Sequence, residues 1–459
     1  MTDPGTTSAA AHRPEDSVAA LQKQFAAIIR GRDPLGWAVA AYRLGLATAE
    51  QPVGPPQDNL RSALGLYQQA AEVLTEDRAP VEHARILNAA GSAHRLLGES
   101  DRALQLFDRS VGLLRGRGAE GEEAAVRSNL GLALSEMGRI DGAIQAFAEA
   151  VEILPTETDE HLRTRIATQH NLAQAHAAKG TTEGFAAAVD VLEQAAESAK
   201  TIDAPMHLAM VWHTLGVTHK GWHSGSSGSG GGGTNLTGDD GHVAAAIEAF
   251  ERCLTIFTSV GFPFQHAIAK HNLGHALAAR SDLASLQRAL VCYEDALNIF
   301  DPRLHGPHWR EVYANTEALD LRLAALAPRA SRADHTAAYL GALDEAERLA
   351  VMRQRFVQLE RLPPRPRVER LTEFAYAVVT QPADSYVATL RTMISVLMEL
   401  PESMLRATLD AQLAAHALLE PGDRRAADFI LDEAINLLLF GPQRIRVRDL
   451  LSDIGWERP

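Results

Sequence analysis

Histidine is the residue type in this sequence with the clearest capacity for chemistry, and there are 18 of them. A neutral imidazole can bind zinc, and an imidazole beside a thiol can act as a general base. Three histidines share one setting, three residues before the small residue of a recurring residue pair. They are His170, His213 and His271. Because they fall on separate repeats, neighbours are expected about 10 Å apart. Zinc–nitrogen bonds are roughly 2.0–2.1 Å long, so no metal site is predicted.

Asparagine recurs at the adjacent position, two residues before the same small residue. The three examples are Asn129, Asn171 and Asn272. A side-chain amide carries donors and acceptors, so it can bind the N–H and C=O groups of an extended peptide whatever its sequence. The alternative interpretation is that these amides only cap or solvate a helix surface. The series is incomplete, because other residues replace Asn in three repeats. These replacements are Arg43, Ala89 and Thr214.

Enzyme motifs are missing from the sequence, which contains no G-x-S-x-G, H-E-x-x-H or P-loop pattern. Cys253 stands where a small residue packs between two helices, so we expect a buried, unreactive thiol and disfavour a nucleophilic pair with His271. No lysine follows the glycine run 230–233 and no predicted strand precedes it, so a phosphate-binding loop is disfavoured. We therefore predict no catalytic residue and no cofactor.

Composition limits the classes of partner. The net charge of −14 argues against nucleic acid, since phosphate binding needs clustered Lys and Arg. Two cysteines cannot form a disulfide framework. We see neither a signal peptide near Met1 nor an apolar run of membrane-spanning length. The sequence therefore predicts a cytoplasmic protein that does not bind membranes.

The elements that must position these side chains follow from an internal repeat. A pair ending in a small residue recurs at Leu44-Gly45, Ala90-Gly91, Leu130-Gly131, Leu172-Ala173, Leu215-Gly216 and Leu273-Gly274. Each pair precedes a small-x-x-x-large-x-x-small motif, at Ala63/Tyr67/Ala70, Ala103/Phe107/Ser110, Ala143/Phe147/Ala150, Ala188/Leu192/Ala195, Ala246/Phe250/Cys253 and Ala289/Tyr293/Ala296. Small residues let two helices approach closely, and the large residue one turn later fills the groove beside their crossing. The sequence predicts six helix pairs.

These two motifs resemble the tetratricopeptide repeat (TPR) family, in which a first helix carries Leu-Gly and a second carries Ala-x-x-x-Phe. The period near 42 residues is similar to the long-period repeats of kinesin light chains and of proteins associated with CHAT domains. The resemblance covers residues 35–327 and implies an all-α fold, a right-handed superhelix (an α-solenoid) followed by a C-terminal helical domain. Ala173 departs from the usual Gly, and a degenerate seventh repeat lies around Trp309 to Leu326.

The resemblance also implies which residues face a concave groove. Both the Asn series and the row His170, His213 and His271 correspond to groove positions of the family. Further groove candidates are Asn88, Gln174 and His275. His94, His176 and His219 occupy a position where the family packs a Tyr between helices, so we interpret them as core residues. A chaperone-tail reader is disfavoured, because the basic residues that should accompany Lys270 are missing.

Domain limits follow from the extent of the repeats. We predict a disordered tail over 1–14, a capping helix over 15–34, the TPR solenoid over 35–327 and an all-helical domain over 328–459. A Gly/Ser-rich loop, 221–241, is inserted in the fifth repeat. In the last domain one long helix, Arg332 to Leu362, should precede four further helical segments separated by prolines. Some of these segments are strongly apolar, which indicates a compact core or a face for a partner, including a homo-oligomer.

The functional hypothesis is a non-enzymatic TPR scaffold or adaptor that binds a peptide or protein segment in its concave groove. Two alternatives remain open. One is a bacterial peptide-sensing regulatory TPR protein, although only about 30 residues precede the repeats, too few for a helix-turn-helix domain. The other is an unrecognised enzymatic activity in the C-terminal helical block.

Overall fold

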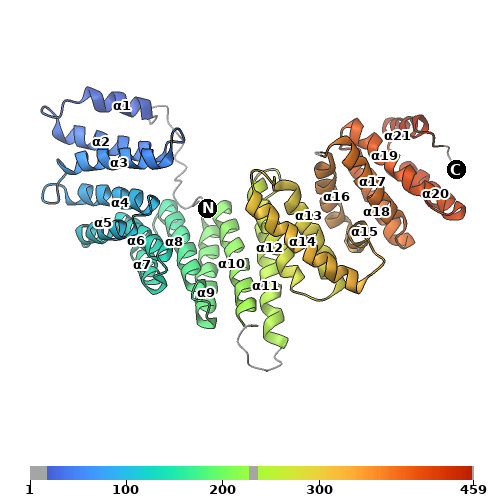
Figure 1. Ribbon diagram of the computed structural model, residues 1–459, viewed down its shortest axis with the longest axis horizontal. Coiled ribbons are helices and arrows are strands. Elements are labelled where there is room, and N and C mark those ends of the chain that lie inside the picture. Colours follow the sequence, from blue (N-terminus) through green and yellow to red (C-terminus); the bar gives the residue numbers. More distant parts are fainter. Residues whose placement is uncertain (1–17, 227–235, 361, 457–458) are drawn as a thin grey trace. The chain divides into compact units, whose positions relative to one another are not determined.

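The computed structural model describes residues 18–226, 236–360, 362–456 and 459. Throughout these ranges the regular structure consists of α-helices, as the sequence predicts for an all-α repeat fold (Figure 1). The expected disordered tail lies outside the described residues. The bounds predicted for the Gly/Ser-rich loop, 221–241, are wrong, because α10 continues to Ser226 and α11 begins at Leu236, and the remaining residues 227–235 lie outside the described ranges. By its internal contacts the chain divides into an N-terminal part, residues 1–249, and a C-terminal part, residues 250–459. The predicted domain limits at 34/35 and 327/328 stay predictions.

The N-terminal part consists of helical hairpins. Its helices are α1 (Val18–Ala27), α2 (Pro34–Glu50), α3 (Pro56–Ala71), α4 (Pro80–Leu96), α5 (Ser100–Leu114), α6 (Glu120–Glu136), α7 (Ile140–Ile153), α8 (Asp159–Ala177), α9 (Thr182–Thr201) and α10 (Pro205–Ser226), followed by α11 (Leu236–Leu254), which extends beyond residue 249. The helices of each hairpin pack together, α2 with α3, α4 with α5, α6 with α7 and α8 with α9. The first helices also contact one another in order from α2 to α10 (Figure 1).

Each hairpin closes around the contact that the motifs predict. A methyl group placed on Gly91 would lie 2.7 Å from the Phe107 ring, and one on Gly131 would lie 2.6 Å from the Phe147 ring. Both rings are buried. The first helix thus passes so near an aromatic ring of the second that only glycine fits, which confirms the predicted role of the Leu-Gly pair.

The fourth repeat reaches the same packing with other residues. Ala173 replaces the glycine and Leu192 replaces the aromatic residue, and both are fully buried. The additional methyl group on the first helix is therefore matched by a smaller side chain on the second. This exchange conserves the volume at the crossing, the kind of substitution that helical cores tolerate best.

The C-terminal part begins with the last repeats and continues as a different helical stack. Its helices are α12 (Pro263–Ala278), α13 (Leu283–Ile299), α14 (Gly306–Leu326), α15 (Arg332–Ala342), α16 (Glu345–Glu360), α17 (Pro364–Val379), α18 (Ala383–Leu397), α19 (Glu402–Ala417), α20 (Pro421–Leu438) and α21 (Gly441–Asp453). From α15 onward helices pack on the helix two places away, α15 on α17, α17 on α19, α16 on α18 and α18 on α20. They share one buried core that includes Leu390, Met393 and Leu431.

Two expectations for this block are wrong. The single helix from Arg332 to Leu362 is divided between α15 and α16, because Leu343 is extended at φ −74° and ψ 154° and Asp344 Oδ1 accepts a 2.8 Å hydrogen bond from the Glu347 N–H. An aspartate followed three residues later by glutamate signals a helix start, and the sequence carries it. Five helices, not four, follow the proline break. The additional helix is α21, whose weak apolar pattern is a poor signal for a helix in the sequence.

Candidate functional site

The predicted site residues of the N-terminal part lie on a surface formed by the first helices α2, α4, α6, α8 and α10, here called the first-helix surface. Positions on it are counted from the small residue of each pair. Position −3 holds Tyr42, Asn88, Ser128, His170 and His213, and position −2 holds Arg43, Ala89, Asn129, Asn171 and Thr214. The two rows lie beside the seams between adjacent first helices, because hydrogen bonds join members of one row to members of the other across those seams.

Hydrogen bonds across two of these seams join the same two positions: position −3 of one repeat is bonded to position −2 of the next repeat. Asn129 Nδ2 donates to Asn88 Oδ1 at 2.9 Å, across α4 and α6. His170 Nε2 and Thr214 Oγ1 are 2.6 Å apart, across α8 and α10. Thr214 therefore does not simply interrupt the Asn series, because it supplies the partner of a histidine. These side chains tie neighbouring repeats together.

The seam between α6 and α8 differs. Ser128 Oγ and Thr168 Oγ1 are 3.0 Å apart, and Thr168 donates to the Thr164 carbonyl, so Ser128 is the donor between the two hydroxyls. Asn171, at position −2, is half-buried and has no side-chain hydrogen bond to any residue within the described ranges. Its amide is therefore available for a ligand, with both donor and acceptor groups.

His213 on this surface is a neutral side chain at pH 7. Burial lowers its pKa to about 4, and the electrostatic interactions with His170 and Lys220 act in the same direction. The Gln174 amide nitrogen lies 3.1 Å from His170 Nε2, which also contacts the Thr214 hydroxyl. Because an amide nitrogen can only donate, His170 Nε2 accepts the hydrogen bond from Gln174. His170 is thus held as a hydrogen-bonding group of this surface.

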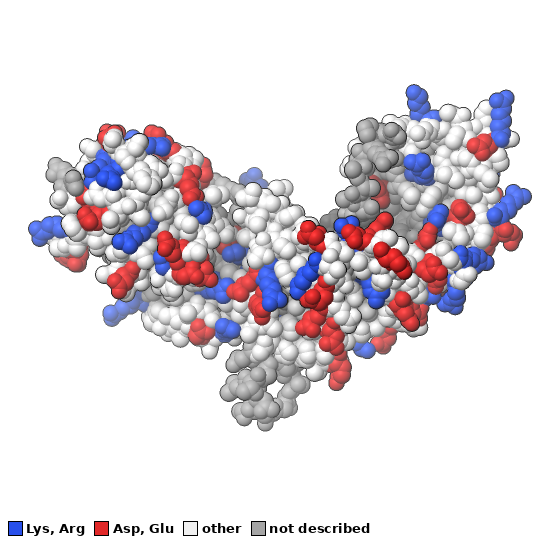
Figure 2. Space-filling view, turned by 180° about the vertical axis from the view of Figure 1, so that it is seen from behind, with Lys and Arg blue, Asp and Glu red and all other residues white. Residues whose placement is uncertain are grey.

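Charged side chains near this surface are largely neutralised within the protein. Arg85 pairs with Glu122 at 2.5 Å, and the hydrogen bond that Arg85 donates to Glu122 raises the pKa of Arg85. Arg95 pairs with Glu136, and Lys179 pairs with Asp141 at 2.9 Å. Figure 2 likewise shows basic and acidic side chains intermixed on the face it presents. No strongly basic strip for a carboxylate or phosphate ligand is built by these three pairs.

The predicted residues of the sixth repeat belong to the C-terminal part and are described separately. His271 is buried, and Asn315 Nδ2 donates to its Nε2 at 2.9 Å. Asn272 is half-buried and His275 is exposed. Lys270 forms a buried 2.8 Å ion pair with Asp295. Burial alone would lower the pKa of Lys270, but the Asp295 charge outweighs it and raises that pKa, so Lys270 is engaged internally.

The histidines interpreted as core residues have varied surroundings. His94 Nδ1 lies 2.8 Å from Glu99 Oε2. Burial lowers the pKa of His176. His219 Nδ1 lies 3.2 Å from His242 Nδ1, and burial followed by the His242 charge lowers the pKa of His219 to about 4. All three imidazoles are half-buried and none is fully buried, so the expectation that they are core residues is met only in part.

Neither a catalytic thiol nor a metal cluster is found in the parts of the chain that the structure describes. Cys253 is fully buried, as predicted, and burial raises its pKa to about 12, so its thiolate is not formed at pH 7. Across the described ranges no group of three or more His, Cys, Asp or Glu side chains is arranged to hold a metal ion. In the same ranges no helix has the length and apolarity needed to cross a membrane.

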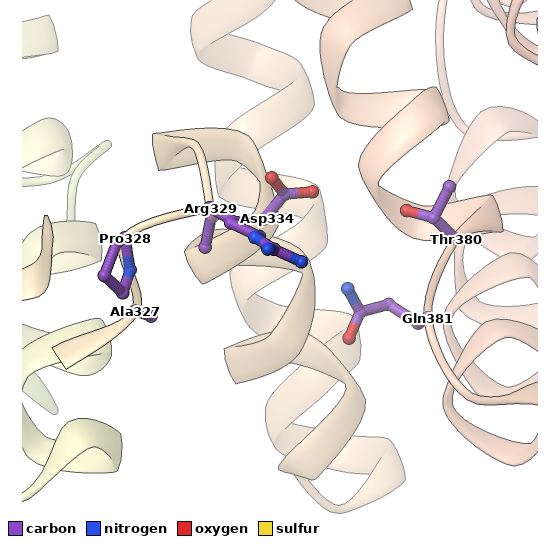
Figure 3. Close-up of a pocket in the computed structure, with 7 residues that line it drawn as sticks. Ala327, Pro328, Arg329, Asp334, Thr380 and Gln381 are labelled. Carbon is purple, nitrogen blue, oxygen red and sulfur yellow. The ribbon is translucent and has the colours of Figure 1, made fainter.

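A cavity of about 570 Å³ lies in the C-terminal part, between the 327–330 segment and the end of α17 (Figure 3). Its lining residues are Ala327, Pro328, Arg329, Ala330, Asp334, Thr380 and Gln381. Arg329 points into the cavity opposite Gln381 in Figure 3, whereas Asp334 caps the start of α15 through Ser331. The lining includes no paired nucleophile and base, so it lacks the constellation of a hydrolytic site.

Sequence reasoning placed the polar rows on one surface but missed which residues bond across the seams. Thr168 and Asn315 were not singled out, although Thr168 contacts Ser128 and Asn315 contacts His271. A usable signal was their spacing, because both lie one repeat length, 40 or 44 residues, beyond their partners. Whether the predicted groove residues contact a ligand stays a prediction.

A family model for the tetratricopeptide repeat matches residues 124–156, which include all of α7 and most of α6 in the third hairpin. The prediction of tetratricopeptide repeats is thereby confirmed. The search of curated proteins finds no match.

Several solved structures are similar to this chain. BtubC (BKLC) from P. vanneervenii is 17% identical over 53% of this chain and 89% of its own, with a TM-score of 0.41. A kinesin light chain with nearly identical TPR-like repeats from Podosopora anserina is 18% identical over 53% and 98%, with a TM-score of 0.36. The C-terminal part of a TPR repeat-containing protein from Cytophaga hutchinsonii is 13% identical over 81% and 98%, with a TM-score of 0.38. No functional inference is drawn from scores this low.

Proposed function

We propose that this tetratricopeptide-repeat protein is a non-enzymatic scaffold whose first-helix surface binds an extended segment of another polypeptide. TPR repeats generally mediate protein–protein interaction, and the chain carries such repeats. Beyond this general role, we propose where the ligand binds on this surface and which residues contact it.

The observation that supports it is the unpaired amide of Asn171. The Oδ1 and Nδ2 atoms of this half-buried amide remain accessible to solvent, so they can bond to water or to a ligand. The adjacent seam adds open groups of the same kind, since the bond between Asn129 and Asn88 leaves Asn129 Oδ1 and Asn88 Nδ2 without partners among the described residues. Amide groups on α4, α6 and α8 can therefore bond to the N–H and C=O groups of one extended chain.

A catalytic role for the same surface receives no support. His170 is hydrogen-bonded to Thr214, the pKa of His213 is lowered by burial, and Cys253 is a buried thiol. A general base must lie within hydrogen-bond reach of the proton that it removes. The hydroxyl nearest His170 Nε2, that of Thr214, joins α8 to α10 within the repeat packing, so binding is the function that this geometry favours.

Site-specific photo-crosslinking tests the proposal. A photo-reactive residue at position 171 is expected to crosslink to a polypeptide partner, because Asn171 lies in the proposed site. The matched control carries the same residue at position 194, where exposed Gln194 lies on the second helix α9 of the same repeat. Both variants should retain the helical circular dichroism of the parent protein. Equal crosslinking from both positions, or crosslinking from 194 alone, would reject the proposed surface.

A matched pair of single substitutions separates ligand contact from repeat packing. Asn171→Ala removes an amide with no described protein partner, so it should weaken capture of the crosslinked partner with little change in stability. Thr168→Val removes the hydroxyl that contacts Ser128, so it should affect stability more than capture. If Asn171→Ala instead lowered stability and left capture unchanged, Asn171 would stabilise the fold and would not contact the ligand.

A further inference from the structure

We infer that the segment bound on the first-helix surface is uncharged and extended, with large apolar side chains about six residues apart. This inference rests on the proposed function and adds the chemistry of its ligand. It is carried by a row of side chains that neither the Asn series nor the histidine row includes.

The row is position +1, one residue after the small residue of each pair. Its members in the N-terminal part are Leu46, Ser92, Leu132, Gln174 and Val217. Position +1 lies three residues after position −2, on the same helix face. The row alternates, apolar in the first, third and fifth repeats and polar in the second and fourth.

The apolar members offer surface to a ligand. Leu46 is 36% exposed and Val217 is 38% exposed, while Leu132 is half-buried against the core of its hairpin. Gln174, between the last two, is exposed and bonds to His170. Apolar contact points are therefore separated by a polar repeat, and burying each of them under a ligand side chain would be favourable.

The spacing of these points sets the spacing on the ligand. Packed helices lie roughly 8–10 Å apart, so two repeats correspond to about 20 Å. An extended chain rises about 3.3 Å per residue, so it covers that distance in about six residues. Apolar side chains about six residues apart can thus meet Leu46, Leu132 and Val217 in turn.

The charge of the site determines the remaining positions of the ligand. Arg85 and Arg95 are neutralised by Glu122 and Glu136 of the next repeat, and His213 is neutral at pH 7. A charged ligand side chain would lose water here without gaining a free counter-charge from these residues. Uncharged polar side chains between the apolar ones complement the site best.

Fluorescence anisotropy with designed peptides tests the inference on the full chain. The first probe is a labelled peptide of Ser, Thr, Asn and Gln with three leucines about six residues apart. The second has the same composition with the leucines about three residues apart, and the third replaces the polar residues of the first by aspartate. The first is expected to bind about tenfold more tightly than either of the others.

A double variant tests whether the apolar side chains at position +1 bind the first probe. Leu46→Ser with Val217→Ser changes two exposed side chains, so the fold should persist, and affinity for the first probe should fall about tenfold or more. Val53→Ser is the matched control, because Val53 is 75% exposed in the turn between α2 and α3. It should leave the affinity unchanged.

Equal binding of the first two probes, tighter binding of the acidic probe, an unchanged affinity in the double variant, or no binding of any probe each overturns the inference. Its failure is distinguishable from failure of the proposed function. If a partner still crosslinks from position 171 while the leucine spacing has no effect, the surface binds a polypeptide of different chemistry. If crosslinking from 171 also fails, the proposed function itself is rejected.

Discussion

Gly131→Ala is expected to destabilise the third repeat, although alanine ordinarily stabilises a helix. The added methyl group would lie 2.6 Å from Cε1 and 2.8 Å from two further carbons of the Phe147 ring. Carbon atoms attract best at roughly 3.5–4.0 Å, so the ring would have to move by about 1 Å. Phe147 is 1% exposed and therefore has little room to do so.

The magnitude follows from two opposing effects. Overpacking a core costs about 1–3 kcal/mol, whereas replacing glycine by alanine inside a helix gains about 1 kcal/mol. Gly131→Ala should therefore lower the stability by up to about 2 kcal/mol. Gly65→Ala is the matched control, because Gly65 lies inside α3 with no heavy atom within 4 Å of an added methyl group. It should raise the stability by about 1 kcal/mol.

Urea denaturation followed by circular dichroism measures both variants, and hydrogen exchange of α6 and α7 locates the change, since repeat proteins can unfold locally. Combining Gly131→Ala with Phe147→Leu should recover part of the loss, because it reproduces the Ala173 and Leu192 pair of the fourth repeat. If Gly131→Ala stabilised the protein as much as Gly65→Ala does, the steric reasoning would be wrong. The steric reasoning would also be wrong if the double variant showed no coupling between the two sites.

Thr214→Val should destabilise the seam between α8 and α10 by about 1 kcal/mol, because it removes the hydroxyl that bonds His170; urea denaturation checks this. The pKa of His213 is lowered from 6.5 to about 4 on folding, so its contribution to stability is present above pH 6.5 and lost as pH falls toward 4. His213→Gln should flatten the pH dependence of the melting temperature in that window, and an unchanged profile would contradict the assignment. Asp295→Asn should destabilise the protein by about 3–5 kcal/mol, because it leaves the buried Lys270 ammonium without its counter-charge; Lys270→Met with Asp295→Asn should recover part of the loss in a thermal melt.

The repeat architecture could be predicted because each hairpin depends on local chemistry. The spacing from Gly131 to Phe147 places a residue without a side chain against a large ring, and the same close approach recurs at Gly45, Gly91 and Gly274. The division between α15 and α16 was also readable, from Asp344 and Glu347, but the apolar pattern on both sides concealed it. Helix boundaries of this kind depend on one capping bond, whereas periodicity averages over many residues.

The sequence by itself determined which side chains lie on the first-helix surface, because positions three and four residues apart must share a helix face. Only the tertiary structure decided which of them are already occupied. Asn129 is bonded to Asn88 and His170 to Thr214, whereas Asn171 is left open, although Asn129 and Asn171 hold the same place in their repeats. The physical reason is that a seam joins residues about 40 positions apart, and its bonds depend on which side chains meet there, since Asn88 bonds to Asn129 whereas Ser128 bonds to Thr168. The repeat period of the sequence does not show which side chains of neighbouring repeats form these bonds.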